Sequence, residues 1–259
     1  MKPRGLVLGN SHAACLREAW RQAQPAGFDL VFLAAHKEKM DGLAFADGHA
    51  SAETSDLIET LNKLGMPTRI RLEDYDFFVV TACQVAMFRA VETSRRLAVW
   101  PEAPGPRTLV SGPLFEAALA DALRVTTAYR LIAGVAVAGC PVLVLPQPNP
   151  HKKVLTPDSK FAAFRRLDGT GRSEWLAGMF RSACETAFAG LATVLHQPQE
   201  TIAAEICTGE NYCEGSIMLA AKRFEHKAED VVHANARYGA LQLNQIADAV
   251  GSMAAVTMT

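Results

Sequence analysis

The chain has 259 residues, of which 49% are hydrophobic, so it can bury the core of one large α/β domain or of two small ones. Its 26 Lys and Arg against 27 Asp and Glu give a formal net charge of −1. This balance excludes a strong overall attraction to nucleic acid or to anionic membranes. No apolar run approaches the length of about eighteen residues that a membrane span needs. We therefore expect one domain, residues 1–259, with no nucleic-acid partner and no membrane span.

The six cysteines form no CxxC pair and have no Cys/His spacing typical of zinc sites. Reduced, mostly buried thiols are the default for such a chain, although their even number leaves a disulfide framework formally open. The N-terminus shows no recognisable signal peptide. These features predict a cytoplasmic protein.

Four short apolar segments, at residues 5–8, 28–33, 76–81 and 141–145, have the composition of buried parallel strands. Helices are predicted between them at residues 12–24, 55–64 and 113–137. In the last of these, Ser111 can cap the N-terminus and Gly139 can end the helix. Alternating strands and helices predict an α/β fold with a doubly wound, mainly parallel sheet flanked by helices.

The later part of the chain differs from this alternation. Residues 147–225, approximately, are predicted to form a helical insertion, with helical patterns at 173–196 and 198–206. A final amphipathic helix at 235–250 should pack back on the sheet.

The first predicted strand is followed by a short segment that can carry chemistry. The strand breaks at Gly9, and a helix rich in small residues begins just after Ser11. This order places Ser11 at the carboxyl end of a parallel strand, facing a helix N-terminus, where α/β proteins bind ligands. Ser11 is therefore a candidate nucleophile, and the alternative is that it simply caps the helix.

Asp230 and His233 stand three residues apart, just before the last predicted helix. A serine hydroxyl becomes a good nucleophile when a histidine removes its proton, and an acid holds and supports that histidine. Asp230 and His233 suit these two roles. The alternative is a capped helix start with a hydrogen-bonded histidine.

Together, the segment Gly9-Asn10-Ser11 and the motif Asp230-x-x-His233 resemble the first and last blocks of the SGNH/GDSL hydrolase family. The longer segment GNSHA is similar to a variant of SGNH domains associated with acyl transfer to bacterial surface sugars. The resemblance implies an SGNH/flavodoxin-like fold and a catalytic triad of Ser11, His233 and Asp230.

The same resemblance implies an oxyanion hole, in which the family uses a serine N–H, a glycine N–H after the second strand and an asparagine amide after the third. Gly42 is the candidate glycine here. Gln84 stands where the asparagine is expected and can offer an equivalent amide, or it can be an ordinary helix-start glutamine. His12 can contact substrate or oxyanion, or it can be a packing residue.

The basic cluster His151-Lys152-Lys153 follows the fourth predicted strand, where it can meet an anionic substrate or form a solvated loop.

The expected function is that of a serine esterase or acyltransferase acting on an acyl ester through an acyl-enzyme, with an O-acetylated carbohydrate as the expected substrate class. This chemistry needs neither a metal nor an organic cofactor. The alternative is a catalytically impaired SGNH-fold protein that binds a glycan or acyl compound. Asn10 in place of the family's aspartate and the missing asparagine favour that alternative. The expected partner is a small-molecule or carbohydrate ester, and a homo-oligomer is left open.

Overall fold

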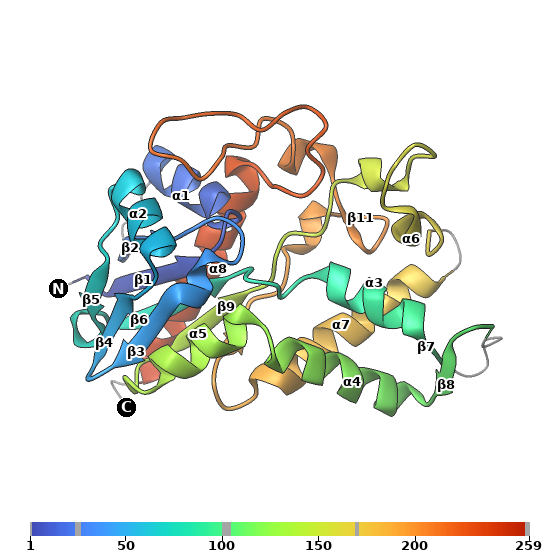
Figure 1. Ribbon diagram of the computed structural model, residues 1–259, viewed down its shortest axis with the longest axis horizontal. Helices are drawn as coiled ribbons and strands as arrows, with labels where there is room; N and C mark the ends of the chain where they lie inside the picture. Colours follow the sequence, from blue (N-terminus) through green and yellow to red (C-terminus); the bar gives the residue numbers. More distant parts are fainter. Residues whose placement is uncertain (1, 24–26, 100–104, 169–170, 257–259) are drawn as a thin grey trace.

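The computed structural model describes residues 2–23, 27–99, 105–168 and 171–256. Its centre is a five-stranded sheet whose strands all pair in parallel (Figure 1). The strand order is β10-β9-β6-β1-β2, in which the strands are β1 Arg4–Gly9, β2 Asp29–Ala34, β6 Phe77–Thr81, β9 Val142–Leu145 and β10 Thr193–Val194. Numbered along the chain this is the order 2-1-3-4-5, which is compatible with a doubly wound α/β fold.

Four of these strands, β1, β2, β6 and β9, confirm the predicted apolar segments, with no end shifted by more than one residue. All five residues of β6 are buried, as expected for a central strand that is covered on both faces. Side chains alternate between the faces, so Leu6 and Leu8 of β1 join one apolar cluster while Val7 joins the other.

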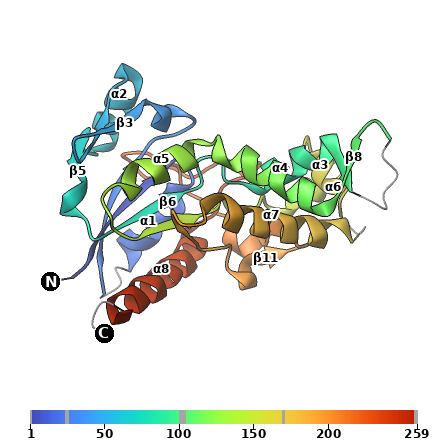
Figure 2. The same cartoon turned by 90° about the horizontal axis from the view of Figure 1, so that it is seen from below.

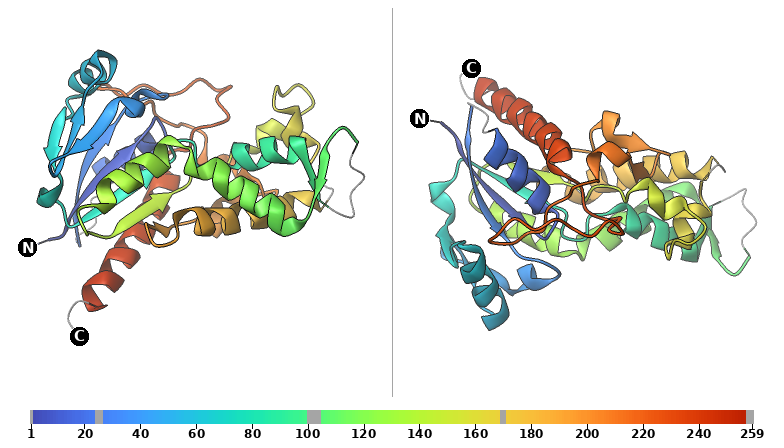
Figure 3. Two further views of the ribbon diagram at one scale, coloured as in Figure 1. Left: turned by 60° about the horizontal axis from the view of Figure 1, so that its bottom comes forward. Right: turned by 90° about the horizontal axis from the view of Figure 1, so that it is seen from above.

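Helices cover both faces of the sheet (Figure 2). On one face, α1 (Ala13–Gln22) and α8 (Ala236–Val256) pack on the strands through Leu16 and Ile246. Figure 3 shows these two helices, near the two ends of the chain, lying side by side. On the other face lies α5 (Thr127–Ala136), which packs through Leu131 and Ile132. The first helix was predicted at residues 12–24, and α1 spans residues 13–22 of that range. Gln24 lies outside the described residues. The last helix packs on the sheet, as predicted.

A small antiparallel sheet lies between β2 and β6 along the chain. Its strands are β3 Leu43–Ala46, β4 His49–Ala52 and β5 Arg69–Arg71. The helix α2 (Ser55–Leu64) matches its predicted bounds, because Thr54 accepts the N–H of Leu57 at its start and Gly65 takes a positive φ of 67° at its end. The sequence did not predict the three strands, which are short.

The single helix predicted at residues 113–137 was wrong, because the chain forms two helices there. The first is α4 (Gly112–Arg124), capped by Ser111 as predicted, and the second is α5. Thr126 causes the break: its hydroxyl donates to the carbonyl of Leu123 and accepts the N–H of Tyr129. It thus ends one helix and caps the next.

A group of helices, α3 (Met87–Arg96), α4, α6 (Ala162–Arg165) and α7 (Arg172–Phe188), extends away from the sheet, on the right in Figure 1. It is continued by the strands β7 Leu97–Val99 and β8 Thr108–Val110. Because α3 and α4 precede residue 147, this group does not come from the predicted insertion at 147–225 alone. The assignment of the whole chain to one domain stays a prediction.

Two helices predicted in that insertion were placed wrongly. The helix predicted at 173–196 ends at Phe188, and β10 then adds to the edge of the sheet. Residues 198–206 form a short turn and part of a hairpin rather than a helix. The remaining short elements are η1 Lys39–Gly42, η2 Leu72–Asp74, η3 Lys152–Leu155, η4 Gln199–Thr201, η5 Glu210–Tyr212, β11 Ile202–Ala203 and β12 Cys207–Thr208.

In the part of the chain that the structure describes, no helix has the length and apolar character needed to cross a membrane. All six cysteines lie in the described ranges, and each is a free thiol.

Candidate active site

Ser11 lies just beyond the end of β1 at the carboxyl edge of the sheet. Gly9 ends this strand, and a Cβ at this position would stand 2.5 Å from the Thr81 side chain, so glycine permits the close approach of β1 and β6. The side chain of Asn10 accepts the N–H of His12 at 3.1 Å, and so Asn10 satisfies the backbone before α1. The hydroxyl of Ser11 instead lies 3.0 Å from Nε2 of His233. Ser11 is therefore not the helix cap.

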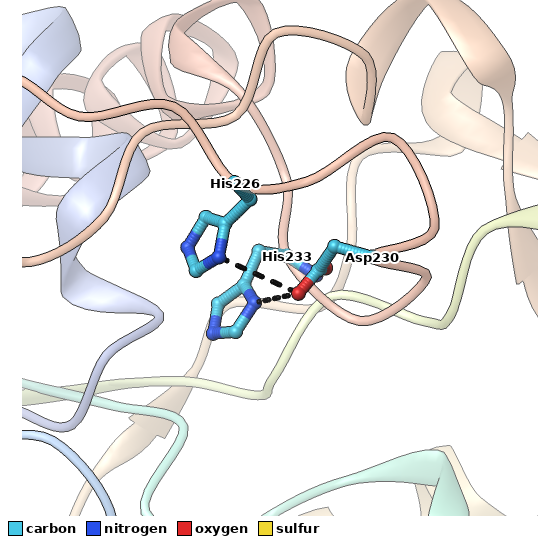
Figure 4. Close-up of side chains that lie close together, drawn as sticks. All are labelled: His226, Asp230 and His233. Carbon is cyan, nitrogen blue, oxygen red and sulfur yellow. Dashed lines mark hydrogen bonds and ion pairs between the residues drawn. The ribbon is translucent and has the colours of Figure 1, made fainter.

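Asp230 uses its two carboxylate oxygens for different tasks. Oδ1 accepts the backbone N–H groups of Val232 and His233, at 3.0 and 2.9 Å, and Oδ2 lies 2.9 Å from Nδ1 of His233 (Figure 4). The spacing of three residues is what allows one carboxylate to fix both the backbone turn and the ring. Partial burial opposes ionisation, but the hydrogen bonds and charge of His233 outweigh it and hold the pKa of Asp230 well below its ordinary value.

The three residues predicted for catalysis therefore meet, although Ser11 and His233 are 222 positions apart along the chain. Because Asp230 is an ionised acceptor, His233 carries its proton on Nδ1 and leaves Nε2 free to accept from the hydroxyl of Ser11. An acid, an imidazole and a serine hydroxyl in this order can perform nucleophilic acyl transfer.

His226 belongs to the same cluster and was missed from the sequence. Its ring stacks on that of His233 with 3.9 Å between centroids and 11° between planes, and its Nδ1 lies 3.4 Å from Oδ2 of Asp230 (Figure 4). It stands four residues before Asp230, in a segment without a predicted element. Its position four residues before Asp230 is the sequence feature from which it could have been predicted.

His12 stacks on His233 as well, with 4.6 Å between centroids and 23° between planes. His12 and His226 therefore both pack against the ring of His233. Burial, and then the charge of His233, lowers the pKa of both flanking histidines, that of His12 most strongly. The flanking rings are therefore held neutral near pH 7. The structure thus gives His12 a packing role against the imidazole of His233.

This arrangement predicts a loss of stability in mild acid. A buried histidine whose pKa is lowered in the folded state binds fewer protons than in the unfolded chain, so the free energy of unfolding falls as the pH drops below the ordinary value of 6.5. His12→Phe keeps a stacked ring without a titrating nitrogen and should flatten this pH dependence between about pH 6.5 and 5. Urea unfolding across this range measures it. His12→Asn, which also lacks a titrating nitrogen, serves as a second variant. If the free energy of unfolding fell equally with pH in both variants and in the wild type, His12 would not be the source of the pH dependence.

Gln84 also lies at the carboxyl edge of the sheet, since Gly9 of β1 is paired with Thr81 of β6. The turn that follows β6 holds three consecutive non-glycine residues at positive φ, namely Ala82, Cys83 and Gln84 at 59°, 44° and 75°. Such backbone strain is concentrated at functional sites. Oε1 of Gln84 accepts the N–H of Thr127, at 3.4 Å, which leaves its amide NH₂ as the donor.

Gly42 ends the turn η1 and packs against Thr54, whose Oγ1 would be 2.1 Å from a Cβ at this position. Its neighbour Asp41 accepts a hydrogen bond from Thr127 at 2.6 Å, which ties this loop to the same end of α5 as Gln84. Among the described residues, no hydrogen bond joins Gly42 to Ser11. Its close approach to Thr54 gives a packing reason for the glycine.

In the basic cluster after β9, both lysines form ion pairs with carboxylates. Lys152 pairs with Glu210 at 2.9 Å and Lys153 with Glu214 at 3.6 Å. His151 is buried, and its backbone N–H donates to the carbonyl of Val231 at 2.7 Å. This segment therefore supports the loop that carries Asp230 and His233.

No protein-family model and no curated protein matched the chain.

Proposed function

We propose that the chain is a serine esterase or acyltransferase in which Ser11 attacks an acyl ester. One observation carries the proposal: the hydroxyl of Ser11 lies 3.0 Å from Nε2 of His233, while Nδ1 of the same ring lies 2.9 Å from Asp230. The resemblance of the two end motifs to SGNH/GDSL hydrolases supports the same reaction class and an SGNH-type fold.

In the first half of this reaction, Nε2 of His233 takes the proton of Ser11 while Oγ bonds to the ester carbonyl carbon. Asp230 stabilises the resulting imidazolium through its carboxylate, which is ionised because its pKa is lowered. The stacked rings of His12 and His226 are neutral, so they place no second positive charge beside it. The imidazolium then protonates the leaving alcohol, and an acyl group remains on Ser11.

The negative charge on the carbonyl oxygen needs hydrogen-bond donors. Within the described chain, the backbone N–H of Ser11 donates to no acceptor, and neither does that of Cys83 or Gln84. These groups lie just after two neighbouring strands at one sheet edge, since β1 and β6 are paired up to Gly9 and Thr81. We assign the donors to the Ser11 N–H and the Gln84 amide.

In the second half, His233 removes a proton from water or from an acceptor hydroxyl, which attacks the acyl group and frees Ser11. Water makes the protein an esterase, and a sugar hydroxyl makes it an acyltransferase. The similarity of the GNSHA segment to domains that acylate surface sugars favours an O-acetylated carbohydrate as the substrate.

The purified protein should cleave short p-nitrophenyl esters and release acetate from acetylated sugars. A protein that binds such compounds without turnover would show saturable binding by calorimetry but no product. Product formation above that of a Ser11→Ala sample therefore supports the proposal, whereas binding alone favours the impaired binding protein.

Gln84→Ala should lower kcat by about 10²-fold if its amide stabilises the oxyanion. KM should change little, because the donor acts mainly in the transition state. Gln84→Glu keeps the acceptor for Thr127 but removes the NH₂ donor, so it should lose a similar factor. Steady-state kinetics of both variants measure this. Full turnover in Gln84→Glu would assign the second donor to another group.

A further inference from the structure

His226, Asp230 and His233 offer three metal-binding atoms, all within 4.8 Å of one another. Two imidazole nitrogens and a carboxylate are donors that suit Zn²⁺. The Nδ1 atoms of the two histidines both face Oδ2 of Asp230, at 3.4 and 2.9 Å (Figure 4). Donors around a tetrahedral zinc ion stand about 3.3 Å apart, which is close to these distances. An ion shared by both Nδ1 atoms must lie near the plane of each ring, so the ring of His226 has to rotate out of its stack on His233 when the metal binds.

The charge at this cluster also suits a cation. In the described chain, the ion pairs of Asp230 are with histidines alone, and no lysine or arginine neutralises it. Among the described residues, the buried Nε2 atom of His226 has no hydrogen-bond partner, so no hydrogen bond at Nε2 fixes the position of the proton on this ring. Its Nε2 can carry the proton when Nδ1 binds a metal.

The cluster is also reachable. His226 and Asp230 line a pocket of about 290 Å³, together with Glu214, Ser216 and Glu225. Lys153 and Lys227 line it as well, so three carboxylates face two ammonium groups there. This pocket gives a metal ion a path from solvent, and it leaves a side of the cluster where water can supply a fourth ligand.

We propose that His226, Asp230 and His233 form a binding site for a divalent transition metal such as Zn²⁺, and that metal binding reversibly switches off the base that activates Ser11. The second part rests on the proposed function, whereas the first does not.

The switch follows from the two tautomers of His233. Without metal, the ring carries its proton on Nδ1 and accepts from Ser11 at Nε2. A metal ion on Nδ1 takes that lone pair, so the proton of the neutral ring moves, by way of solvent, to Nε2. Nε2–H then donates to Oγ of Ser11, and the hydroxyl has no base. No proton is released overall from either ring.

A second cluster, of His151, Glu210 and Glu214, lacks these properties and serves as an internal control. Its carboxylates are paired with Lys152 and Lys153. Nδ1 of His151 accepts the N–H of Lys153 at 2.9 Å, so the proton stands on Nε2 and would have to leave before a metal could bind there.

Zinc binding is tested on the full chain carrying Ser11→Ala, which keeps all three donors, by competition with a chromophoric chelator. We expect one high-affinity ion per chain, and a loss of at least about tenfold in affinity when His226→Asn or Asp230→Asn is added. Glu210→Gln, which removes a donor of the second cluster, should leave the affinity unchanged. Absence of binding, or equal affinity in His226→Asn and its parent, would overturn the site.

The switch is tested separately by ¹⁵N NMR of the histidine rings. Zinc should convert His233 from the Nδ1–H to the Nε2–H tautomer, and in the wild type one equivalent should abolish ester cleavage until EDTA is added. Zinc bound without a tautomer change, or with undiminished cleavage, would overturn the switch. A protein that binds zinc and changes tautomer but never cleaves esters would instead contradict the proposed function.

Discussion

Ser11→Ala and His233→Ala are each expected to lower kcat/KM for ester cleavage by at least about 10⁴-fold. Ser11 supplies the atom that bonds to the acyl group, and His233 supplies the nitrogen 3.0 Å away that takes its proton. Because both residues act in one step, the double variant should be no slower than the worse single variant by more than a few-fold. Steady-state kinetics with a p-nitrophenyl ester provide the comparison.

The control for this prediction is stability. Since Asn10, and not Ser11, holds the backbone at the start of α1, Ser11→Ala should change the free energy of unfolding by less than about 1 kcal/mol. A folded Ser11→Ala protein that cleaves esters at the wild-type rate would remove Ser11 from the mechanism. Losses that multiply in the double variant would show that the two residues act in separate steps.

Gly239→Ala is expected to destabilise the fold by about 3 kcal/mol, the upper part of the range for overpacking. Gly239 lies where α8 crosses α1, and a Cβ there would stand 2.2 Å from the carbonyl oxygen of Cys15 and 2.9 Å from the N atom of Leu16. These are backbone atoms of α1, so no side-chain rotation relieves the clash, and the helix that begins just after Ser11 must move. Urea unfolding and ester cleavage should both report the change.

The same helix offers a matched control in Gly251, where an added Cβ meets no atom within 4 Å. Gly251→Ala should stabilise the protein by up to about 1 kcal/mol, because alanine favours the helical conformation. If Gly239→Ala were as stable as Gly251→Ala, the close approach of the two helices would not exist in solution.

The central sheet was predictable because four of its strands are short apolar segments in a chain that alternates strands and helices. The elements that were missed depend on side-chain hydrogen bonds and on strand pairing, which the apolar pattern does not reveal. The break in the helix predicted at 113–137 comes from two side-chain hydrogen bonds of Thr126, and apolar periodicity continues across it. The edge strand β10 has two residues and takes its identity from pairing with β9.

At the candidate active site, residue types and short motifs predicted the three catalytic side chains, which hydrophobic periodicity alone does not identify. A serine after a strand and an Asp-x-x-His motif before the last helix specified three groups that the fold brings together. The stacking of His12 and His226 on His233 could not be predicted from the sequence, because contacts between these rings arise from tertiary packing. Gln84 was placed at the correct edge of the sheet, but its strained turn, with three consecutive positive φ angles, has no signature in those residue types.

The central claim is that Ser11 is an activated nucleophile, and its most direct test is labelling with a fluorophosphonate followed by peptide mass spectrometry. An activated serine displaces fluoride and forms a stable phosphonyl ester, whereas an ordinary hydroxyl does not react. We predict one adduct per chain, located on Ser11, and its loss in His233→Ala. An unlabelled wild-type protein, or equal labelling of Ser11 in His233→Ala, would contradict the account.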